Sequence, residues 1–315
     1  MVASQILASV TRIYDLVMTH KLDADDLFIH RIQQHCAELG LNFFLIEPVW
    51  VEPFCDLYAK GRIWARALLN MHSEHHQPDD VYHRLVRLVH DRKTQVIDPP
   101  DVALAAFDKA RLHARLASAG FNLPFTLIVA RDQVESFILS EPDRAALGTP
   151  FVIKPGMGYG RRGVVLDAMS ERDLARSVAA WPDRHYLLQR RIAPRTSSNG
   201  EPVYFRLYYV FGSVWCCWWN CFTDRYRLPT PPEEEQLALT PLHDIVHRLA
   251  ALSGMKFFSS EVALTEAGDL VLIDYVNDQC HMLSQSSNPQ MGVPDELVTA
   301  IARRLVEGVR TLIQS

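Results

Sequence analysis

The chain has 315 residues, and at roughly 150 residues per domain this length predicts about two compact domains with buried cores of their own. Its composition, 48% hydrophobic and 22% charged with 14 Gly and 18 Pro, excludes collagen-like, coiled-coil and disordered proteins. The formal net charge of -5 argues against a general nucleic-acid binder, because affinity for a phosphate backbone requires a surplus of Lys and Arg.

Basic residues are concentrated in the middle of the chain. Between Arg144 and Arg227 there are 13 Lys and Arg against 6 Asp and Glu, a local charge of +7, so the remainder carries -12 (-5 minus 7). A basic segment in an acidic chain indicates either a bound, highly charged small anion or a solvated surface.

The cysteines and the N-terminus indicate a reducing compartment. None of the six cysteines forms a CxxC pair or a zinc-ribbon spacing. The first residues lack a basic segment followed by an apolar block and a cleavage site, and no run approaches about 18 apolar residues. We therefore expect a cytoplasmic, membrane-free protein, and the sequence is compatible with a homodimer.

Residues 1–100 alternate short apolar runs with amphipathic segments. Because strands and helices that alternate at this interval form parallel sheets, we expect a small parallel α/β domain that ends at Asp98-Pro99-Pro100. The expected strands are Ile13–Met18, Phe43–Ile46, Arg66–Met71 and Gln95–Ile97, and the expected helices are Ala24–Leu39 and Val81–Val89.

The rest of the chain is predicted to contain longer strands joined by glycine turns. Expected strands are Thr126–Val129, Phe151–Lys154, Gly163–Leu166, Tyr186–Gln189, Val203–Phe211, Ser213–Cys221, Glu261–Leu264 and Leu270–Asp274. Expected helices are Val102–Ala119, one that begins near Asp132, Glu171–Ala180, Leu242–Ser253 and Glu296–Ile313, with a polar break over Pro229–Glu235.

A glycine-rich segment, VIKPGMGYGRRGV, is the strongest single motif. Its glycines at 156, 158, 160 and 163 let backbone N–H groups approach an anion, and Lys154, Arg161 and Arg162 add charge, so the segment can cradle a polyphosphate. The segment lacks GxxxxGK[ST], and no helix follows it in the register of the GxGxxG dinucleotide motif. An ordinary mobile β-turn is an equally good interpretation of the segment alone.

Acidic side chains lie at the ends of the last predicted hairpin. Glu261 opens one strand and Asp274 closes the next, with Asn277 and Asp278 just beyond. Two carboxylates and an amide oxygen form the hard-oxygen site that Mg²⁺ uses beside nucleotide phosphates. Solvated hairpin ends are the alternative.

The order of these motifs resembles the ATP-grasp superfamily, and in particular its RimK-like carboxylate–amine ligases. The resemblance covers about residues 100–290, through DPPDVALAAFDKARL, FVIKPGMGYGRRGV, YLLQRRI, YFRLYYVFGSV and SSEVALTEAGDLVLIDYVND. It implies an α/β (α+β) protein in which a small N-terminal parallel α/β domain precedes a two-lobed ATP-grasp module. The implied segments are 1–100 for the first domain, 101–190 for the central lobe with its lid loop, and 191–315 for the C-terminal lobe with the metal-binding hairpin.

The resemblance also implies roles for individual residues in binding ATP. Lys109 and Lys154 match the two phosphate-contacting lysines of the family. The resemblance assigns a catalytic role to two residues, Lys154 and Arg206. Gln189 matches the hinge position that accepts a hydrogen bond from the adenine amino group, usually a Glu. The remaining nucleotide contacts are assigned to the lid loop, Gly156, Gly158, Tyr159, Gly160 and Arg161, and to Arg190, Arg191 and Ile192 after the hinge.

The implied metal site departs from the pattern of the family. Glu261, Asp274 and Asn277 match the ligands of Mg²⁺, with Mn²⁺ as a substitute, but the family has Glu-x-Asn where this chain has Asp274-Tyr-Val-Asn277. Because side chains alternate along a strand, an offset of three places Asp274 and Asn277 on opposite faces unless a bulge intervenes. Asp278 therefore competes with Asn277 as third ligand.

The implied reaction is ATP-dependent joining of a small-molecule carboxylate to an amine through an acyl phosphate. Arg206 matches the family arginine that faces the γ-phosphate, so Arg206→Ala is expected to abolish turnover with the fold intact. A small-molecule kinase and a non-catalytic ATP-binding protein are the alternatives. The identities of the carboxylate and the nucleophile do not follow from the sequence.

Several further residues attract attention without joining this pattern. A solvated loop is the preferred interpretation of His72, His75 and His76, ahead of a metal site or substrate contact. Packing is preferred for the cysteines of WCCWWNC. The other candidates are a helical His243/His247 pair, Cys280-His281 as cleft lining, an acceptor pocket lined by Trp215, Trp218 and Trp219, and an acidic-substrate site at Arg190, Arg195, Arg225 and Arg227.

Overall fold

The computed structural model describes residues 11–19, 26–197, 200–237 and 239–314. The chain divides into two compact units. One consists of Met1–Asp101 together with Gln279–Ser315, and the other is Val102–Asp278.

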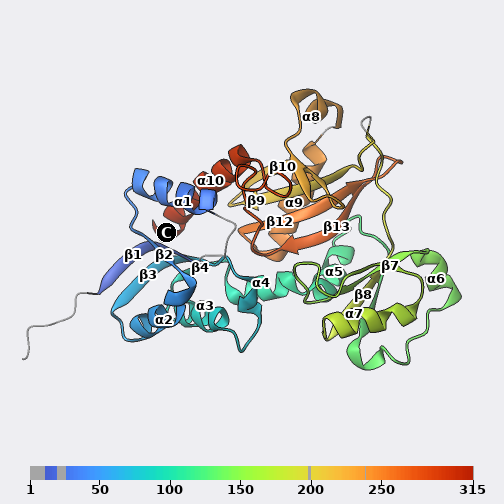
Figure 1. The fold of residues 1–315 in the computed structure, drawn as a ribbon, viewed down its shortest axis with the longest axis horizontal. Helices are drawn as coiled ribbons and strands as arrows, with labels where there is room; N and C mark the ends of the chain where they lie inside the picture. The colour runs from blue at the N-terminus through green and yellow to red at the C-terminus, as the bar shows by residue number, and fades with distance from the viewer. Residues whose placement is uncertain (1–10, 20–25, 198–199, 238, 315) are drawn as a thin grey trace, which may run out of the picture. The chain divides into compact units, whose positions relative to one another are not determined.

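The first unit is built on a parallel sheet, as its alternating pattern predicts. The strand order is β2-β1-β3-β4, and every neighbouring pair is parallel. Figure 1 shows α1 and α10 on one side of this sheet and α2 and α3 on the other. The elements are β1 (Arg12–Thr19), α1 (Asp26–Glu38), β2 (Phe43–Ile46), η1 (Pro48–Trp50), α2 (Val51–Ala59), β3 (Ile63–Leu69), η2 (Ser73–His76), α3 (Val81–Asp91), β4 (Gln95–Ile97) and α10 (Asp295–Gln314).

The terminal helix belongs to this first unit, which differs from the predicted segment 191–315. Helix α10 packs against α1, and its apolar residues Leu297, Ile301 and Leu305 are fully or almost fully buried. These positions recur every four residues, so they form one apolar stripe that needs a partner. The sequence pattern predicts the stripe, but it does not say which unit covers it.

The first half of the second unit contains an antiparallel sheet of order β5-β8-β6-β7, with an apolar core that includes Phe151, Ile153 and Leu188. The predicted helix Val102–Ala119 is wrong, because the chain breaks at Asp108, whose carboxylate accepts from the N–H of Arg111 and caps a second helix. The elements are α4 (Pro100–Phe107), α5 (Lys109–Ser118), β5 (Thr126–Ala130), η3 (Arg131–Gln133), α6 (Glu141–Leu147), β6 (Phe151–Pro155), β7 (Val165–Ala168), η4 (Glu171–Asp173), α7 (Leu174–Ala180) and β8 (His185–Gln189).

The second half of this unit contains a five-stranded antiparallel sheet of order β11-β10-β9-β12-β13. One face carries a large apolar core that includes Phe205, Leu207 and Val262. The predicted hairpins are confirmed, whereas the predicted polar break over Pro229–Glu235 contains a helix. The elements are β9 (Tyr204–Val210), β10 (Ser213–Asn220), β11 (Arg225–Arg227), α8 (Pro231–Leu237), α9 (Thr240–Ser253), β12 (Phe257–Leu264) and β13 (Leu270–Asn277).

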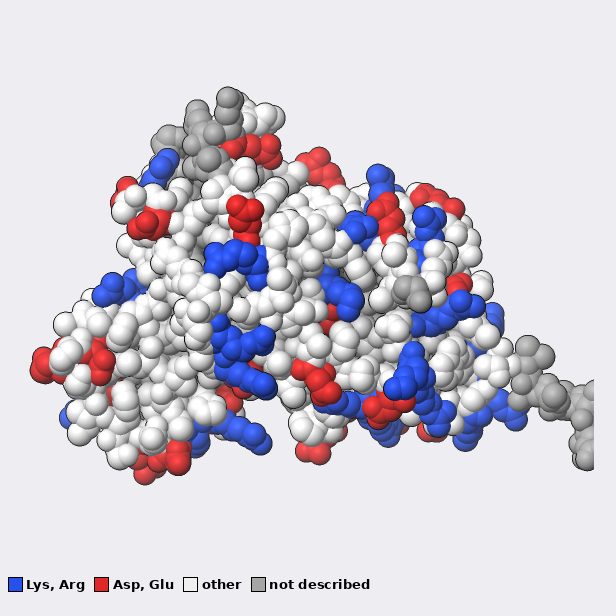
Figure 2. Space-filling model, turned by 180° about the vertical axis from the view of Figure 1, so that it is seen from behind, with Lys and Arg blue, Asp and Glu red and all other residues white. Residues whose placement is uncertain are grey.

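Ion pairs offset part of the positive charge in the middle of the chain. Arg144 pairs with Glu171, and two more arginines pair with carboxylates outside the basic segment, Arg206 with Glu261 and Arg227 with Glu233. Basic and acidic side chains are interspersed on the face shown in Figure 2. No helix among the described residues is long and apolar enough to cross a membrane.

Candidate active site

Three charged side chains lie directly opposite one another on adjacent strands of the five-stranded sheet. Arg206 on β9 pairs in register with Glu261 on β12, which in turn pairs with Asp274 on β13. Residues that are paired across antiparallel strands project from the same face. The sheet therefore brings together the arginine and both carboxylates that the sequence predicted for one site.

A register shift between β12 and β13 places Asn277 on this same face. Ser259 pairs with Asn277 while Glu261 pairs with Asp274, so β13 has one residue more than β12 over this stretch. A second shift follows between Glu261 and Val262. Such bulges leave ladder groups unpaired, and here the hydroxyl of Ser260 donates to the carbonyl of Asp274 at 2.9 Å. The bulge that the sequence required is present, and it places Asn277 on the same face as Asp274.

Arg206 and Glu261 form a buried ion pair. Their side chains are 9% and 12% exposed, and Nη1 of Arg206 donates to Oε1 of Glu261. Burial opposes the charge on Arg206, but Glu261, together with Tyr226, Tyr208 and Asp274, outweighs burial and raises the pKa of the guanidinium. Burial raises the pKa of Glu261, and the Asp274 carboxylate adds to that shift while Arg206 opposes it. The guanidinium also lies 5.4 Å from the ring centre of Trp219.

Lys109 and Lys154 add positive charge beside Asp274. Lys109 begins α5, and Lys154 lies on β6 and donates through Nζ to the carbonyl of Ile273 at 2.9 Å. Burial alone would raise the pKa of Asp274, but the two lysines, together with Arg206 and a backbone hydrogen bond at Tyr275, outweigh it and lower this pKa below its usual value. Burial lowers the pKa of Lys109, with Asp274 opposing the shift. The two predicted lysines therefore join the carboxylates in one electrostatic cluster.

Lys109 also holds the glycine-rich loop, residues 156–163. Its backbone N–H donates to the carbonyl of Gly156 at 2.9 Å, and Nζ donates to the carbonyl of Gly158 at 2.8 Å. At the far end, Gly163 has φ +72°, and a Cβ there would lie 2.6 Å from Cβ of Trp181. Only glycine fits that position without displacing its neighbours.

The middle of the loop is attached to the five-stranded sheet. Arg161 contacts both carboxylate oxygens of Asp224, at 2.5 and 3.2 Å, and donates to the carbonyl of Cys221 at 3.1 Å. Tyr159 packs edge-on against Trp181, with ring centres 5.4 Å apart. Asp224 lies in the turn between β10 and β11, and the sequence pattern did not single it out.

The predicted hinge residues separate into buried and exposed positions. Gln189 is buried at the end of β8, and Ile192 packs with Tyr204 and Ala263 in a small apolar cluster on the Arg206 face of the sheet. The side chains of Arg190 and Arg191 are exposed, and Nε of Arg190 donates to the carbonyl of Ala146 at 2.6 Å. Any contact of these two arginines with a base is therefore expected from their backbone.

A cavity of about 160 Å³ lies at the β10–β11 edge of the same sheet. Trp218, Trp219, Arg225 and Arg227 line it, as the hypotheses of an aromatic acceptor pocket and an arginine cluster would require. Trp215, Arg190 and Arg195 do not line it. Arg227 is paired with a carboxylate at 2.7 Å, which leaves Arg225 as the arginine of this cavity without a described ion pair.

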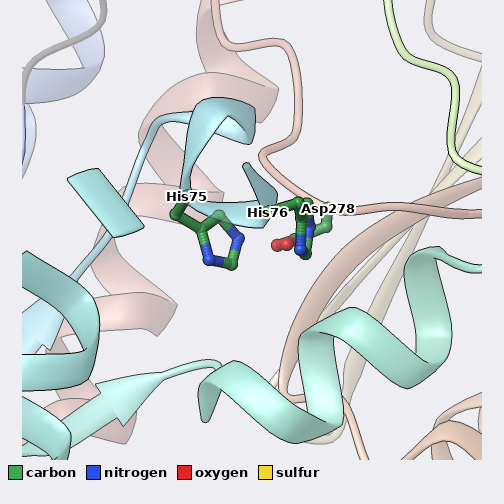
Figure 3. Close-up of side chains that lie close together, drawn as sticks. All are labelled: His75, His76 and Asp278. Carbon is green, nitrogen blue, oxygen red and sulfur yellow. The ribbon is translucent and has the colours of Figure 1, made fainter. Parts of the chain in front are cut away.

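The histidine cluster is packed rather than solvated. His72 and His75 are buried, and the ring of His72 stacks on Tyr82 with ring centres 3.6 Å apart. His75 and His76 lie side by side on η2, with ring centres 3.9 Å apart (Figure 3). The side chain of Gln279 lies 3.3 Å from Nε2 of His75. The expectation of a solvated loop is therefore wrong, because these rings contribute to packing within the first unit.

Packing also accounts for several other candidates. Cys217 is buried, which raises its pKa to about 12, and Cys280 is buried as well. Both His243 and His247 are exposed on α9, and the edge of the His247 ring contacts Tyr209. A thiolate nucleophile is disfavoured at Cys217, because a pKa this high keeps the thiol protonated near neutral pH.

Comparison with known proteins identifies the fold. The chain matches the crystal structure of a RimK-domain ATP-grasp protein from Sphaerobacter thermophilus with a TM-score of 0.64 and 17% identity, covering 95% of this chain and 99% of that chain. It matches D-alanine–D-alanine ligase from Bacillus anthracis complexed with ATP with a TM-score of 0.65 and 12% identity, covering 96% and 97%.

A third similar structure is the ATP-grasp ligase PsnB complexed with a minimal precursor, Mg and ADP. Its TM-score is 0.59 at 13% identity, and the match covers 96% of this chain and 99% of that chain. No protein-family model and no curated protein matches the sequence. The chain therefore has the ATP-grasp fold over nearly its whole length.

Proposed function

We propose that this ATP-grasp protein is an ATP-dependent ligase that joins a carboxylate to an amine. The observation that carries the proposal is the row of Arg206, Glu261 and Asp274 across three adjacent strands, with Asn277 on the same face. This row combines a cationic group for a phosphate with oxygen ligands for a divalent cation, which are the two requirements of phosphoryl transfer.

The residues of the row suit a hard cation such as Mg²⁺. Glu261 and Asp274 offer carboxylate oxygens, and the side-chain amide of Asn277 offers one oxygen beside its nitrogen. The buried Oγ of Ser259, on the same face, has no hydrogen-bond partner among the described residues. An unpartnered buried oxygen on this face is consistent with a ligand or bound water that completes its hydrogen bonding. Bound Mg²⁺ would neutralise charge on the phosphates of ATP.

The side chains of the site would act by positioning and neutralising charge. Lys109 and Lys154 would exchange their carbonyl partners for phosphate oxygens, and Arg206 would stabilise the charge that develops on the transferred group. A substrate carboxylate oxygen would form a bond to the γ-phosphorus as the bond to ADP breaks. The amine nitrogen would then bond to the acyl carbon, phosphate would leave, and the nitrogen would lose a proton.

The register of β13 bears on the non-catalytic alternative. That hypothesis arose from the spacing of Asp274 and Asn277, which would separate them in a regular strand. The bulges remove this objection, because they return both residues to one face. No feature of the described residues specifically favours a kinase, and the products of the two reactions differ.

The test is a screen for ADP release by the full-length protein with Mg-ATP, carboxylates and amines, followed by mass detection of products. The carboxylates include small acids and peptides, because PsnB was solved with a minimal precursor and with a precursor peptide. We expect ADP, free phosphate and an amide. A phosphorylated product that persists would identify a kinase and refute the ligase proposal.

Two variants connect the activity to the site. Asp274→Asn and Arg206→Lys are expected to lower kcat by about 100-fold or more, since each weakens stabilisation of transferring charge. Arg176→Lys, in an exposed ion pair on α7, is the matched control and is expected to retain full activity. Unchanged turnover in Asp274→Asn would rule out the proposed metal site.

A further inference from the structure

The side-chain amide of Gln189 lies in a buried chain of hydrogen bonds. Its Nε2 lies 3.2 Å from Oγ1 of Thr126 on β5 and 3.1 Å from the hydroxyl of Tyr275 on β13. The Tyr275 hydroxyl lies 2.5 Å from Nδ1 of His113 on α5, and Oγ1 of Thr126 lies 2.9 Å from the carbonyl oxygen of Pro124. Four elements therefore converge on the side chain of Gln189, a residue that is 3% exposed.

The proton of Thr126 determines which end of the amide faces it. A threonine hydroxyl has one proton, and the carbonyl of Pro124 can only accept it. Toward Gln189 the same hydroxyl can then only accept. The NH₂ end of the amide must point at Thr126, and this conclusion follows from the network and not from the placement of N and O in the side chain.

The other end of the chain is compatible with the same orientation. Burial lowers the pKa of His113 and so favours its neutral ring, and in the tautomer protonated at Nε2 the Nδ1 atom accepts the proton of the Tyr275 hydroxyl. The Tyr275 oxygen then accepts from Gln189. With this tautomer both amide protons are engaged, and Oε1 of Gln189 accepts no hydrogen bond from another described residue.

Gln189 lies on the same face of its sheet as Lys154. Gln189 pairs in register with Thr126 and Val152, and Lys154 pairs with Leu187, two residues before Gln189 on β8. Both side chains also reach β13, Lys154 at Ile273 and Gln189 at Tyr275. The base end and the phosphate end of a nucleotide would thus meet one sheet face, with the free Oε1 at the base end.

We propose that Thr126 and Tyr275 are positioning residues that lock the Gln189 amide with its oxygen toward the base, so that the site selects a 6-aminopurine nucleotide over a 6-oxopurine nucleotide. This inference rests on the proposed function of the site. The amide oxygen accepts from an exocyclic amino group and repels an exocyclic oxygen. Binding a 6-oxopurine would require the amide to rotate, which would break the hydrogen bonds to Thr126 and Tyr275.

The test compares ATP with GTP in the full-length protein and in Thr126→Val, Tyr275→Phe and the double variant. We expect the wild type to prefer ATP by roughly ten- to hundredfold in kcat/KM, the cost of leaving one buried polar group unpaired. Each variant removes one acceptor or donor from the network while it keeps the shape of the side chain. The ATP/GTP ratio should fall in each single variant and approach unity in the double variant.

The ratio separates positioning from a merely structural role. Loss of stability would lower the activity with both nucleotides equally and leave the ratio unchanged, and that result would overturn the inference, as would a wild type without preference. Thr299→Val is the matched control, because the hydroxyl of Thr299 donates to the carbonyl of Asp295 within its own helix α10. Because Thr126 is only partly buried, Thr126→Val tests the inference even if Tyr275→Phe fails to fold.

Nucleotide binding distinguishes failure of this inference from failure of the proposed function. The rise in Tm with a non-hydrolysable analogue of ATP or GTP reports binding without any acceptor. A preference for the ATP analogue that the variants lose would support the inference even if no ligase activity is found. Equal shifts for both analogues would refute it even in an active ligase.

Discussion

Removing Arg206 is expected to destabilise the protein as well as to stop turnover. The Arg206–Glu261 pair is about nine-tenths buried, and removing one partner from a buried pair typically costs about 3–5 kcal/mol. That is a fifth or more of an unfolding free energy of about 5–15 kcal/mol. The structure therefore adds, to the expectation from sequence, that Arg206→Ala also lowers stability, since Glu261 would remain buried with weaker compensation from Lys154.

A double-mutant cycle measures this coupling. Arg206→Met and Glu261→Gln should each lower the free energy of unfolding by about 3 kcal/mol. The double variant should lose about 2 kcal/mol less than the sum of the two single losses, because it leaves neither charge unpaired. Urea unfolding followed by tryptophan fluorescence suits the measurement, since Trp219 lies against Arg206. The transition is fitted with separate steps if the two units unfold separately.

The matched control for the cycle is the Arg176–Asp167 pair, whose side chains are 55% and 70% exposed. Exposed pairs contribute about 0.2–1 kcal/mol, so its coupling should be several-fold smaller. A coupling energy below about 0.5 kcal/mol between Arg206 and Glu261 would refute the view that their pairing offsets the cost of burying both charges in the sheet.

Three further predictions concern the loop and the sheet edge. Gly163→Ala should lower the free energy of unfolding by about 2 kcal/mol or more, because its Cβ would overlap Trp181. Gly160→Ala has open space around its Cβ and should lower it by only about 1 kcal/mol. Equal losses in urea unfolding would contradict the packing argument. Asp224→Asn should speed proteolytic cleavage within the glycine loop, because it weakens the contact with Arg161. The free energy of unfolding should fall by at most about 1 kcal/mol. An unchanged cleavage rate would show that the pair does not hold the loop. Arg227 holds the pKa of Glu233 at about 2, below its ordinary 4.5, so the stabilisation by this pair is present above pH 4.5 and lost as the pH falls toward 2. Glu233→Gln should therefore lower the free energy of unfolding by at most about 1 kcal/mol at pH 7 and by less at pH 3. An effect that does not change with pH would argue against the pair.

Local pattern was sufficient where an element depends on its own residues. The short strands Phe43–Ile46 and Gln95–Ile97 match their predicted bounds, because apolar runs between turn residues need no distant partner to be recognised. Helix α2 was missed because Pro53 interrupts its pattern, although proline is tolerated in a first helical turn. The break at Asp108 was missed because the N–H of Lys109 bonds a carbonyl of the distant glycine loop.

The candidate site shows the same division between residue identity and geometry. The types and order of Lys154, Arg206, Glu261, Asp274 and Asn277 are evident from the sequence, and they indicate phosphate and metal chemistry through the family they resemble. Which of these side chains share a face is decided only by strand pairing, because alternation assigns a face only after the register and its bulges are known. The orientation of the Gln189 amide likewise depends on Thr126, Tyr275 and His113, which lie 63, 86 and 76 positions away (189 minus 126, 275 minus 189, 189 minus 113) and meet only in the folded chain.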